Sequence, residues 1–253
     1  MYRYFITLSY NGTRFSGWQV QPNAISVQQC LEERLSILLR HETKIIGAGR
    51  TDAGVHARFM VAHFDCEKEI ENIPAIIKKM NGMLPKDIAV KAISSVKKNA
   101  HARFDVLSRT YEYNVSSVKD VFNYEWIYSM PLTKIDFEKM NEACKILYEY
   151  EDFTSFSKLH TNVKTNICRI YAAKWEKKGD IWVFRITANR FLRNMVRAIT
   201  GTMFEIGRGK ITIEDFRKII EAKDRCRVGS SAPACGLLLT DIEYPEDINL
   251  LKT

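Results

Sequence analysis

The sequence lacks the marks of an exported or membrane-spanning protein. No eighteen apolar residues follow one another, and the first residues show no positively charged segment before a long apolar stretch. The six cysteines include no C-x-x-C pair and no histidine spacing typical of a structural zinc site. We therefore expect a cytoplasmic protein with reduced thiols, no membrane association and no metal. Its 253 residues are enough for two modest domains.

What the chain has in excess is positive charge. Its 38 basic and 30 acidic residues leave a net charge of +8. Within residues 169–210, ten basic residues stand against three acidic ones, a local net charge of +7. A concentrated positive field attracts polyanions and makes their binding sensitive to salt. Basic surfaces also occur on proteins that bind no nucleic acid, so the composition alone favours neither interpretation.

The first half of the chain predicts the order strand, helix, strand, strand, helix, strand. Residues 2–10 place Tyr, Tyr, Ile, Leu and Tyr at every second position, the pattern of a half-buried strand. Ser26 and Gln29 have the spacing of a capping box, and an apolar stripe follows them. Further along, the pattern predicts strands at 43–47, 59–65 and 88–96 and a helix over 74–83 that opens with Pro74.

The second half of the chain repeats this order of elements. It predicts strands at 111–116, 167–176, 181–188 and 237–244, a helix near 137–147, a helix over 191–206 and a short helix from Thr212. We therefore predict an α+β fold of two tandem ferredoxin-like units with a central antiparallel sheet, divided into domains 1–105 and 106–253. Unrelated proteins share this topology, so the fold alone settles no function.

One segment combines residue types that support chemistry. Residues 47–57 contain three glycines, Arg50, Asp52 and His56, and they lie between two predicted strands. Glycines let a backbone approach a ligand closely, and an arginine two positions from a carboxylate can hold it ionised and oriented. Such a carboxylate is a plausible nucleophile. For composition alone, a glycine-rich hairpin in which Arg50 and Asp52 only cap the turn is the favoured interpretation.

The complete string Gly49-Arg50-Thr51-Asp52-Ala53-Gly54-Val55-His56-Ala57 is more specific than its composition, because it resembles the signature of the tRNA pseudouridine synthase A family. Four further segments resemble motifs of that family in the same order: Tyr10 to Gln19, His101-Ala102-Arg103-Phe104 followed by Ser108 to Tyr113, Phe191 to Arg197, and Ala232 to Leu237. The resemblance covers nearly the whole chain. Arg193-Asn194 departs from the residues that many relatives carry, which leaves only details of RNA contact open.

The resemblance implies a pseudouridine synthase fold with a basic RNA-binding cleft and an isomerase that converts uridine to pseudouridine. Its substrate would be tRNA, at positions 38 to 40 of the anticodon arm, and two copies of the chain would form a homodimer. Asp52 would be the catalytic carboxylate, and Arg50, Tyr111 and Leu237 would contact the substrate. No cofactor is expected, because the reaction changes neither redox state nor composition. Attack on C1′, attack on the uracil ring and elimination to a glycal all remain open.

Arginines provide candidate phosphate contacts. Placed on the predicted helix over 191–206 at 100° per residue, Arg190, Arg193 and Arg197 share one face, opposite an apolar cluster. Together with Arg14 they are our candidates for binding RNA phosphates. The histidines, in contrast, are interpreted as structural residues without chemistry.

Two other functions compete with this interpretation. A non-catalytic RNA-binding protein, such as a chaperone for tRNA folding, would share the fold and the charge but would not need Asp52. A nucleotide hydrolase or glycosidase would need a second carboxylate or a metal cluster near the first, and none stands out in the sequence.

Overall fold

The computed structural model describes residues 1–158 and 165–248, which form two compact units. Unit 1 contains Met1–Leu107 and the segment that begins at Leu239, and unit 2 contains Ser108–Leu238. This division differs from the expected one in the last residues, which return to unit 1. The end of the closing strand β9 (Leu237–Glu243) is bonded to unit 1, where the Leu107 amide donates to the Glu243 carbonyl at 2.8 Å.

Unit 1 is built on an antiparallel sheet. Strand β1 (Tyr2–Tyr10) pairs with β3 (His56–Cys66) on one side and β4 (Ile88–Val96) on the other, and the two-residue strand β2 (Ile46–Gly47) pairs with β3. The expectation of a half-buried β1 is wrong for its middle, where Tyr4 to Leu8 are all buried. Phe5 is covered because its ring packs edge-on against Tyr244 at 5.5 Å.

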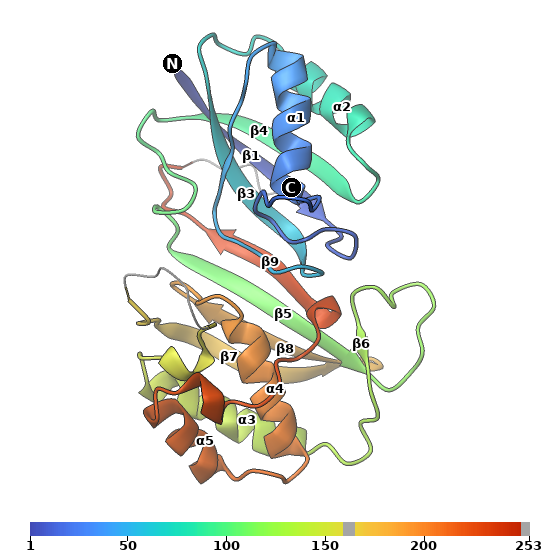
Figure 1. Ribbon diagram of the computed structural model, residues 1–253, viewed down its shortest axis with the longest axis vertical. Helices are drawn as coiled ribbons and strands as arrows, with labels where there is room; N and C mark the ends of the chain where they lie inside the picture. The colour runs from blue at the N-terminus through green and yellow to red at the C-terminus, as the bar shows by residue number, and fades with distance from the viewer. Residues whose placement is uncertain (159–164, 249–253) are drawn as a thin grey trace. The chain divides into compact units, whose positions relative to one another are not determined.

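Two helices lie side by side in unit 1 (Figure 1). Helix α1 (Val27–Leu39) begins after Ser26, whose hydroxyl accepts the Gln29 amide at 3.2 Å. Only this half of the expected capping box is present, because the Gln29 side chain donates to Glu33 instead. Helix α2 (Ile73–Met83) begins after Asn72, with Pro74 in its first turn as predicted, and packs on β4.

Unit 2 also contains an antiparallel sheet, in the order β5-β8-β7. Strand β5 (Ser108–Ser116) pairs with β8 (Ile181–Ala188), which forms a hairpin with β7 (Ile170–Lys178). The short strand β6 (Tyr128–Ser129) runs parallel to the end of β5 and has no counterpart in the predicted order. The whole chain is therefore a mixed α/β protein with mostly antiparallel strands.

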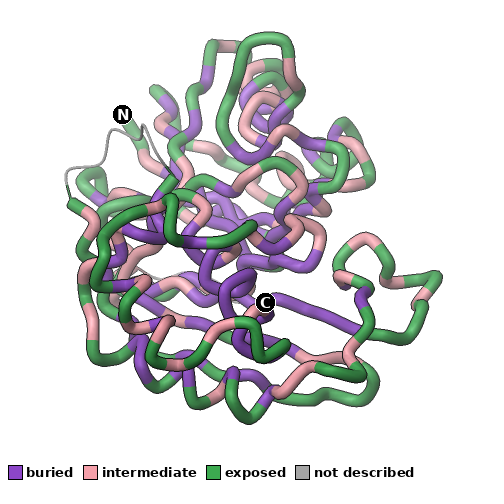
Figure 2. The backbone as a smooth tube through the Cα atoms, turned by 60° about the horizontal axis from the view of Figure 1, so that its bottom comes forward, coloured by how far each residue is buried: buried purple, intermediate pink, exposed green. Residues whose placement is uncertain are grey.

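Three helices pack together in unit 2 (Figure 1): α3 (Phe137–Ile146), α4 (Met195–Gly207) and α5 (Ile213–Glu221). Four short 3-10 turns complete the described elements, at Leu147–Glu149, Thr154–Phe156, Arg225–Arg227 and Ala234–Gly236. The core of this unit gathers around Trp175, whose ring stacks on Phe184 at 5.1 Å. Figure 2 shows long buried stretches of the chain alternating with exposed ones.

Helix α4 begins later than the sequence suggested. The predicted start was residue 191, but Phe191 and Leu192 are irregular, Arg193 and Asn194 form a turn, and the helix starts at Met195. Asn194 has a left-handed backbone with φ of 67°, which cannot continue a right-handed helix. Its side chain holds this position by donating to the Ser231 hydroxyl at 2.7 Å.

None of the helices in the described ranges is long and apolar enough to cross a membrane.

Candidate active site

The Asp52 loop, defined here as residues 48–55, connects β2 to β3 in unit 1. Thr51 is buried, Asp52 is half-buried and Arg50 is exposed. The Val55 amide donates to the Asp52 carbonyl at 3.1 Å, so the aspartate opens a tight turn that leads into β3. A half-buried carboxylate on a turn remains accessible to a ligand while its backbone is fixed.

The Asp52 loop is held by the segment that follows β1. The Trp18 amide donates to the Thr51 carbonyl at 3.2 Å, and the Gly54 amide donates to the Phe15 carbonyl at 3.3 Å. These backbone bonds join two of the segments that resemble family motifs. The presence of both segments in one sequence therefore has a physical basis, because each provides hydrogen-bond partners for backbone groups of the other.

Two glycines make this close approach possible. A Cβ atom at Gly12 would overlap the Val55 carbonyl, and one at Gly17 would overlap the Thr51 carbonyl. Gly17 also has φ of 87°, a conformation that other residues rarely adopt. The distance between the two segments is therefore set by the absence of side chains at these positions.

Side chains also connect the Asp52 loop to the segment that follows β1, and we call these contacts, together with the backbone bonds above, the brace of the Asp52 loop. The hydroxyls of Tyr10 and Thr51 are 2.9 Å apart in a buried environment. The Gly12 amide donates to Nδ1 of His56 at 3.0 Å, which requires the other ring nitrogen of a neutral His56 to carry the proton. Sequence reasoning assigned no role to Tyr10 or to His56. A clue was present, because both residues lie within the two motifs.

The other predicted substrate contacts lie in unit 2. Tyr111 is on β5, 8% exposed, and its ring meets Phe191 edge-on with centroids 5.3 Å apart. Leu237 is buried at the start of β9. Tyr113, two residues after Tyr111, is fully buried, and its hydroxyl has no hydrogen-bond partner among the residues that the structure describes. Burial thereby raises its pKa far above the usual range.

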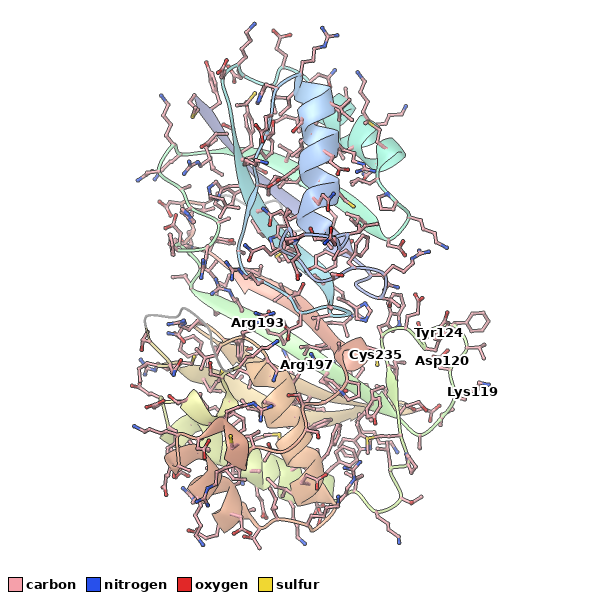
Figure 3. All side chains as sticks on the ribbon, in the orientation of Figure 1. Lys119, Asp120, Tyr124, Arg193, Arg197 and Cys235 are labelled. Atoms are coloured by element: carbon pink, nitrogen blue, oxygen red, sulfur yellow. The ribbon has the colours of Figure 1, made fainter. Side chains whose placement is uncertain are left out.

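The predicted arginine face on one helix is wrong. Arg197 lies on α4, but Arg190 and Arg193 precede it, because the helix starts only at Met195. Figure 3 labels Arg193 and Arg197. Arg197 donates through Nε to the Ala232 carbonyl at 2.8 Å, which joins α4 to the closing family-like segment. In unit 1, Arg14 forms an ion pair with Asp87.

The described residues contain no group of three or more His, Cys, Asp or Glu side chains able to hold a metal ion. Four cysteines are buried: Cys30, Cys66, Cys144 and Cys168. Burial raises the pKa of the Cys144 thiol to about 12, so this cysteine behaves as a small apolar side chain.

Comparison with known proteins identifies the family of the chain. The family model described as tRNA pseudouridine synthase matches residues 6–105 and 143–245. The chain belongs to this family. A protein named tRNA pseudouridine synthase A from Parabacteroides distasonis is 59% identical over 98% of both chains. Proteins of the same name from Bacteroides fragilis and Exiguobacterium sibiricum are 55% and 37% identical, each over 97% of this chain and 98% of the relative.

Proposed function

We propose that the chain converts uridine to pseudouridine at positions 38, 39 and 40 in the anticodon stem-loop of tRNA, with Asp52 as the reacting carboxylate. The family assignment and the names of the relatives support an isomerase that acts on tRNA. The observation that carries the role of Asp52 is its position, half-buried on a turn whose backbone is bonded to a second family-like segment. A fixed carboxylate loses little conformational freedom when it meets substrate.

The reaction explains why one carboxylate suffices. The N1–C1′ bond of the nucleotide breaks, the uracil turns, and C5 forms a bond to C1′. The hydrogen on C5 leaves as a proton and N1 gains a proton, so no atom or electron is gained or lost. Asp52 could attack C1′, attack the uracil ring, or remove a proton to give a glycal. Each route requires a base drawn out of its stack and shielded from water, because water at the activated sugar would cause hydrolysis.

Three further residues complete the proposed substrate contacts. Arg50 would keep Asp52 ionised and help to open the nucleotide into the site. Tyr111 would stack on the flipped uracil and help to move the departing proton, and Leu237 would provide apolar contact. Their support is the resemblance of their sequence segments to family motifs, together with the burial of the Tyr111 and Leu237 side chains.

RNA phosphates would be bound by arginines in a basic cleft. Our candidates are Arg14 in unit 1 and Arg190, Arg193 and Arg197 in unit 2, where residues 169–210 form the most basic stretch of the chain. Since Arg190 and Arg193 precede α4, they would reach the RNA from the connection between β8 and α4 instead of a helix face. Exposed Arg193 is the best placed of the three in unit 2.

The architecture would follow the family as well. The order β1-α1-β2-β3-α2-β4 and the pairing of β1 with both β3 and β4 support a ferredoxin-like fold for unit 1. A second, elaborated copy would comprise β5, α3, β7, β8, α4 and β9, which follow in that chain order. We also propose that the chain acts as a homodimer in the cytoplasm, where its tRNA substrate would be found.

The test uses an unmodified tRNA transcript that has uridines at positions 38, 39 and 40. After incubation with the pure protein, carbodiimide treatment and primer extension should give stops at these positions. Strong tRNA binding without any stop would instead identify a non-catalytic RNA-binding protein. Stops only at other uridines would contradict the proposed target site, and cleavage of the glycosidic bond would indicate a hydrolase.

A further inference from the structure

The Arg103 turn, defined here as residues 100–105, has no part in the function proposed above. It follows β4 in unit 1 and contains the family-like string His101-Ala102-Arg103-Phe104. Three side chains from elsewhere in unit 1 hold its backbone. Arg3 donates to the Ala100 carbonyl at 2.9 Å, the Tyr244 hydroxyl donates to the Ala102 carbonyl, and Nδ1 of His63 accepts the Ala102 amide at 3.1 Å.

Side chains within the turn satisfy the rest of its backbone. Nδ1 of His101 accepts the amides of Arg103 at 3.1 Å and Phe104 at 3.3 Å. The Asp105 carboxylate accepts the His101 amide at 2.7 Å. These bonds, together with the outside anchors, fix the conformation of the turn before any ligand arrives, which reduces the entropy lost on binding.

The turn displays an arginine beside an aromatic ring. Arg103 is exposed, Phe104 is 74% exposed, and the guanidinium carbon lies 5.7 Å from the Phe104 ring centroid. The ring of His101 lies 4.3 Å from that of Phe104 and supports it from one side. Phe104 also borders a surface hollow of about 330 Å³, which Lys97, Asn99, Leu107 and Pro245 help to line.

We propose that Arg103 and Phe104 form a second contact for the RNA substrate, with the guanidinium on a phosphate and the ring stacked on a base. This inference rests on the proposed function. Proteins bind unpaired nucleotides through this combination of a cation and an aromatic face.

The contact would involve nucleotides other than the one that reacts. His56 follows the Asp52 loop at the start of β3, and His63, which anchors the Arg103 turn, lies seven residues further along the same strand. At about 3.3 Å per residue, this separation is roughly 23 Å. The turn would therefore increase the affinity for tRNA without changing the chemical step, and it would act on KM and not on kcat.

Steady-state kinetics on full-length tRNA test this proposal. We expect Phe104→Ala and Arg103→Ala each to raise KM and the tRNA dissociation constant by on the order of tenfold with kcat unchanged. Phe104→Trp should retain wild-type affinity, because it keeps a stacking surface. Arg103→Ala should also reduce the slope of log affinity against log salt by about 0.7 to 0.9, the effect of one lost phosphate contact.

Two matched variants serve as controls. Arg34→Ala removes the same charge from α1 of unit 1, where Arg34 pairs with Glu33, and Phe122→Ala truncates another exposed phenylalanine. Neither should change KM or the salt slope. Circular dichroism and urea unfolding would establish that each variant is folded, and if Phe104→Ala were not, Arg103→Ala with its salt slope and Phe104→Trp would still decide the question.

The proposal would be overturned if Arg103→Ala and Phe104→Ala bound tRNA as the wild type does. A changed sedimentation coefficient with unchanged tRNA affinity would overturn it as well, by assigning this surface to a protein partner. Failure of the proposed function is a separate outcome: wild-type protein that never forms pseudouridine would refute that function whatever the variants show.

Discussion

The Asp52 loop and the Arg103 turn are both irregular segments of unit 1, but they are held in different ways. The Asp52 loop is bonded largely to the backbone of the segment after β1, at a distance that Gly12 and Gly17 permit. The Arg103 turn is held largely by side chains, among them the imidazoles of His63 and His101. A loop held by close backbone approach is sensitive to added volume, whereas a turn held by imidazoles is sensitive to protons.

Adding one methyl group to the brace of the Asp52 loop should have the largest effect. In Gly12→Ala the new Cβ would overlap the Val55 carbonyl, so the two segments must move apart. We expect a loss of about 1–3 kcal/mol in the free energy of unfolding. Activity should fall by on the order of a hundredfold, because catalysis is sensitive to displacements of about 1 Å.

Gly82→Ala is the matched control for Gly12→Ala. Gly82 lies in the last turn of α2, and a Cβ there would meet no atom within 4 Å. This substitution should increase the free energy of unfolding by about 0.5–1 kcal/mol through helix propensity, with activity unchanged. Equal losses in both variants, measured by urea unfolding and turnover, would contradict the importance of the close approach.

The buried hydroxyl pair in the same brace should have a smaller effect. Tyr10→Phe leaves the Thr51 hydroxyl without the partner that now lies 2.9 Å away, at a cost of about 1–3 kcal/mol in the free energy of unfolding. Adding Thr51→Val should cost less than the sum of the two single changes, because the pair is then removed together. Urea unfolding of the four proteins measures this coupling, and strictly additive losses would show that the two hydroxyls do not stabilise each other.

Acid should reduce the stability of the Arg103 turn, and this effect should be the smallest of those predicted here. Burial, followed by the nearby Arg3 and His101, lowers the pKa of His63 to about 4, while Asp65 and Asp105 act in the opposite direction. An unfolded histidine titrates near pH 6.5, so between pH 6.5 and about 4 the unfolded state binds the proton more readily. Stability from neutral His63 is therefore complete above pH 6.5 and is lost as the pH falls towards 4.

Urea unfolding of wild type and His63→Asn at several pH values checks this expectation. Asparagine keeps an acceptor for the Ala102 amide but does not titrate, so the variant should lose less stability than the wild type between pH 6.5 and 4. Identical pH slopes would show that His63 is not the group responsible. Amide exchange at pH 5 would sharpen the comparison, because the Arg103 turn should open before the Asp52 loop.

The sequence predicted most accurately those elements that depend on local chemistry. The predicted β4 and β8 match the observed bounds, and Ser26 and Pro74 were placed correctly at the starts of their helices. The start of α4 was missed because apolar periodicity continues through Phe191 and Leu192, while a contact with Ser231 holds Asn194 in a left-handed conformation. No local pattern contains a bond between residues 37 positions apart.

In the candidate site, too, the contacts between residues far apart in the sequence could not be predicted. The motif identified the loop around Asp52, but the sequence could not show that Gly12, Tyr10 and His56 hold it. These contacts connect residues separated by more than forty positions, and they arise only when β1 pairs with β3. The full burial in the middle of β1 was hidden for a similar reason, since Tyr244 covers Phe5 from the far end of the chain.

Tritium release from tRNA that contains 5-tritiated uridine tests the role of Asp52 most directly, because bond formation at C5 expels that hydrogen. Wild-type protein should release tritium in proportion to the pseudouridine formed. Asp52→Asn, which keeps the shape of the side chain and removes its charge, should bind the same tRNA with similar affinity and release none. Tritium release by Asp52→Asn at the wild-type rate would contradict the assignment of this carboxylate to the chemistry.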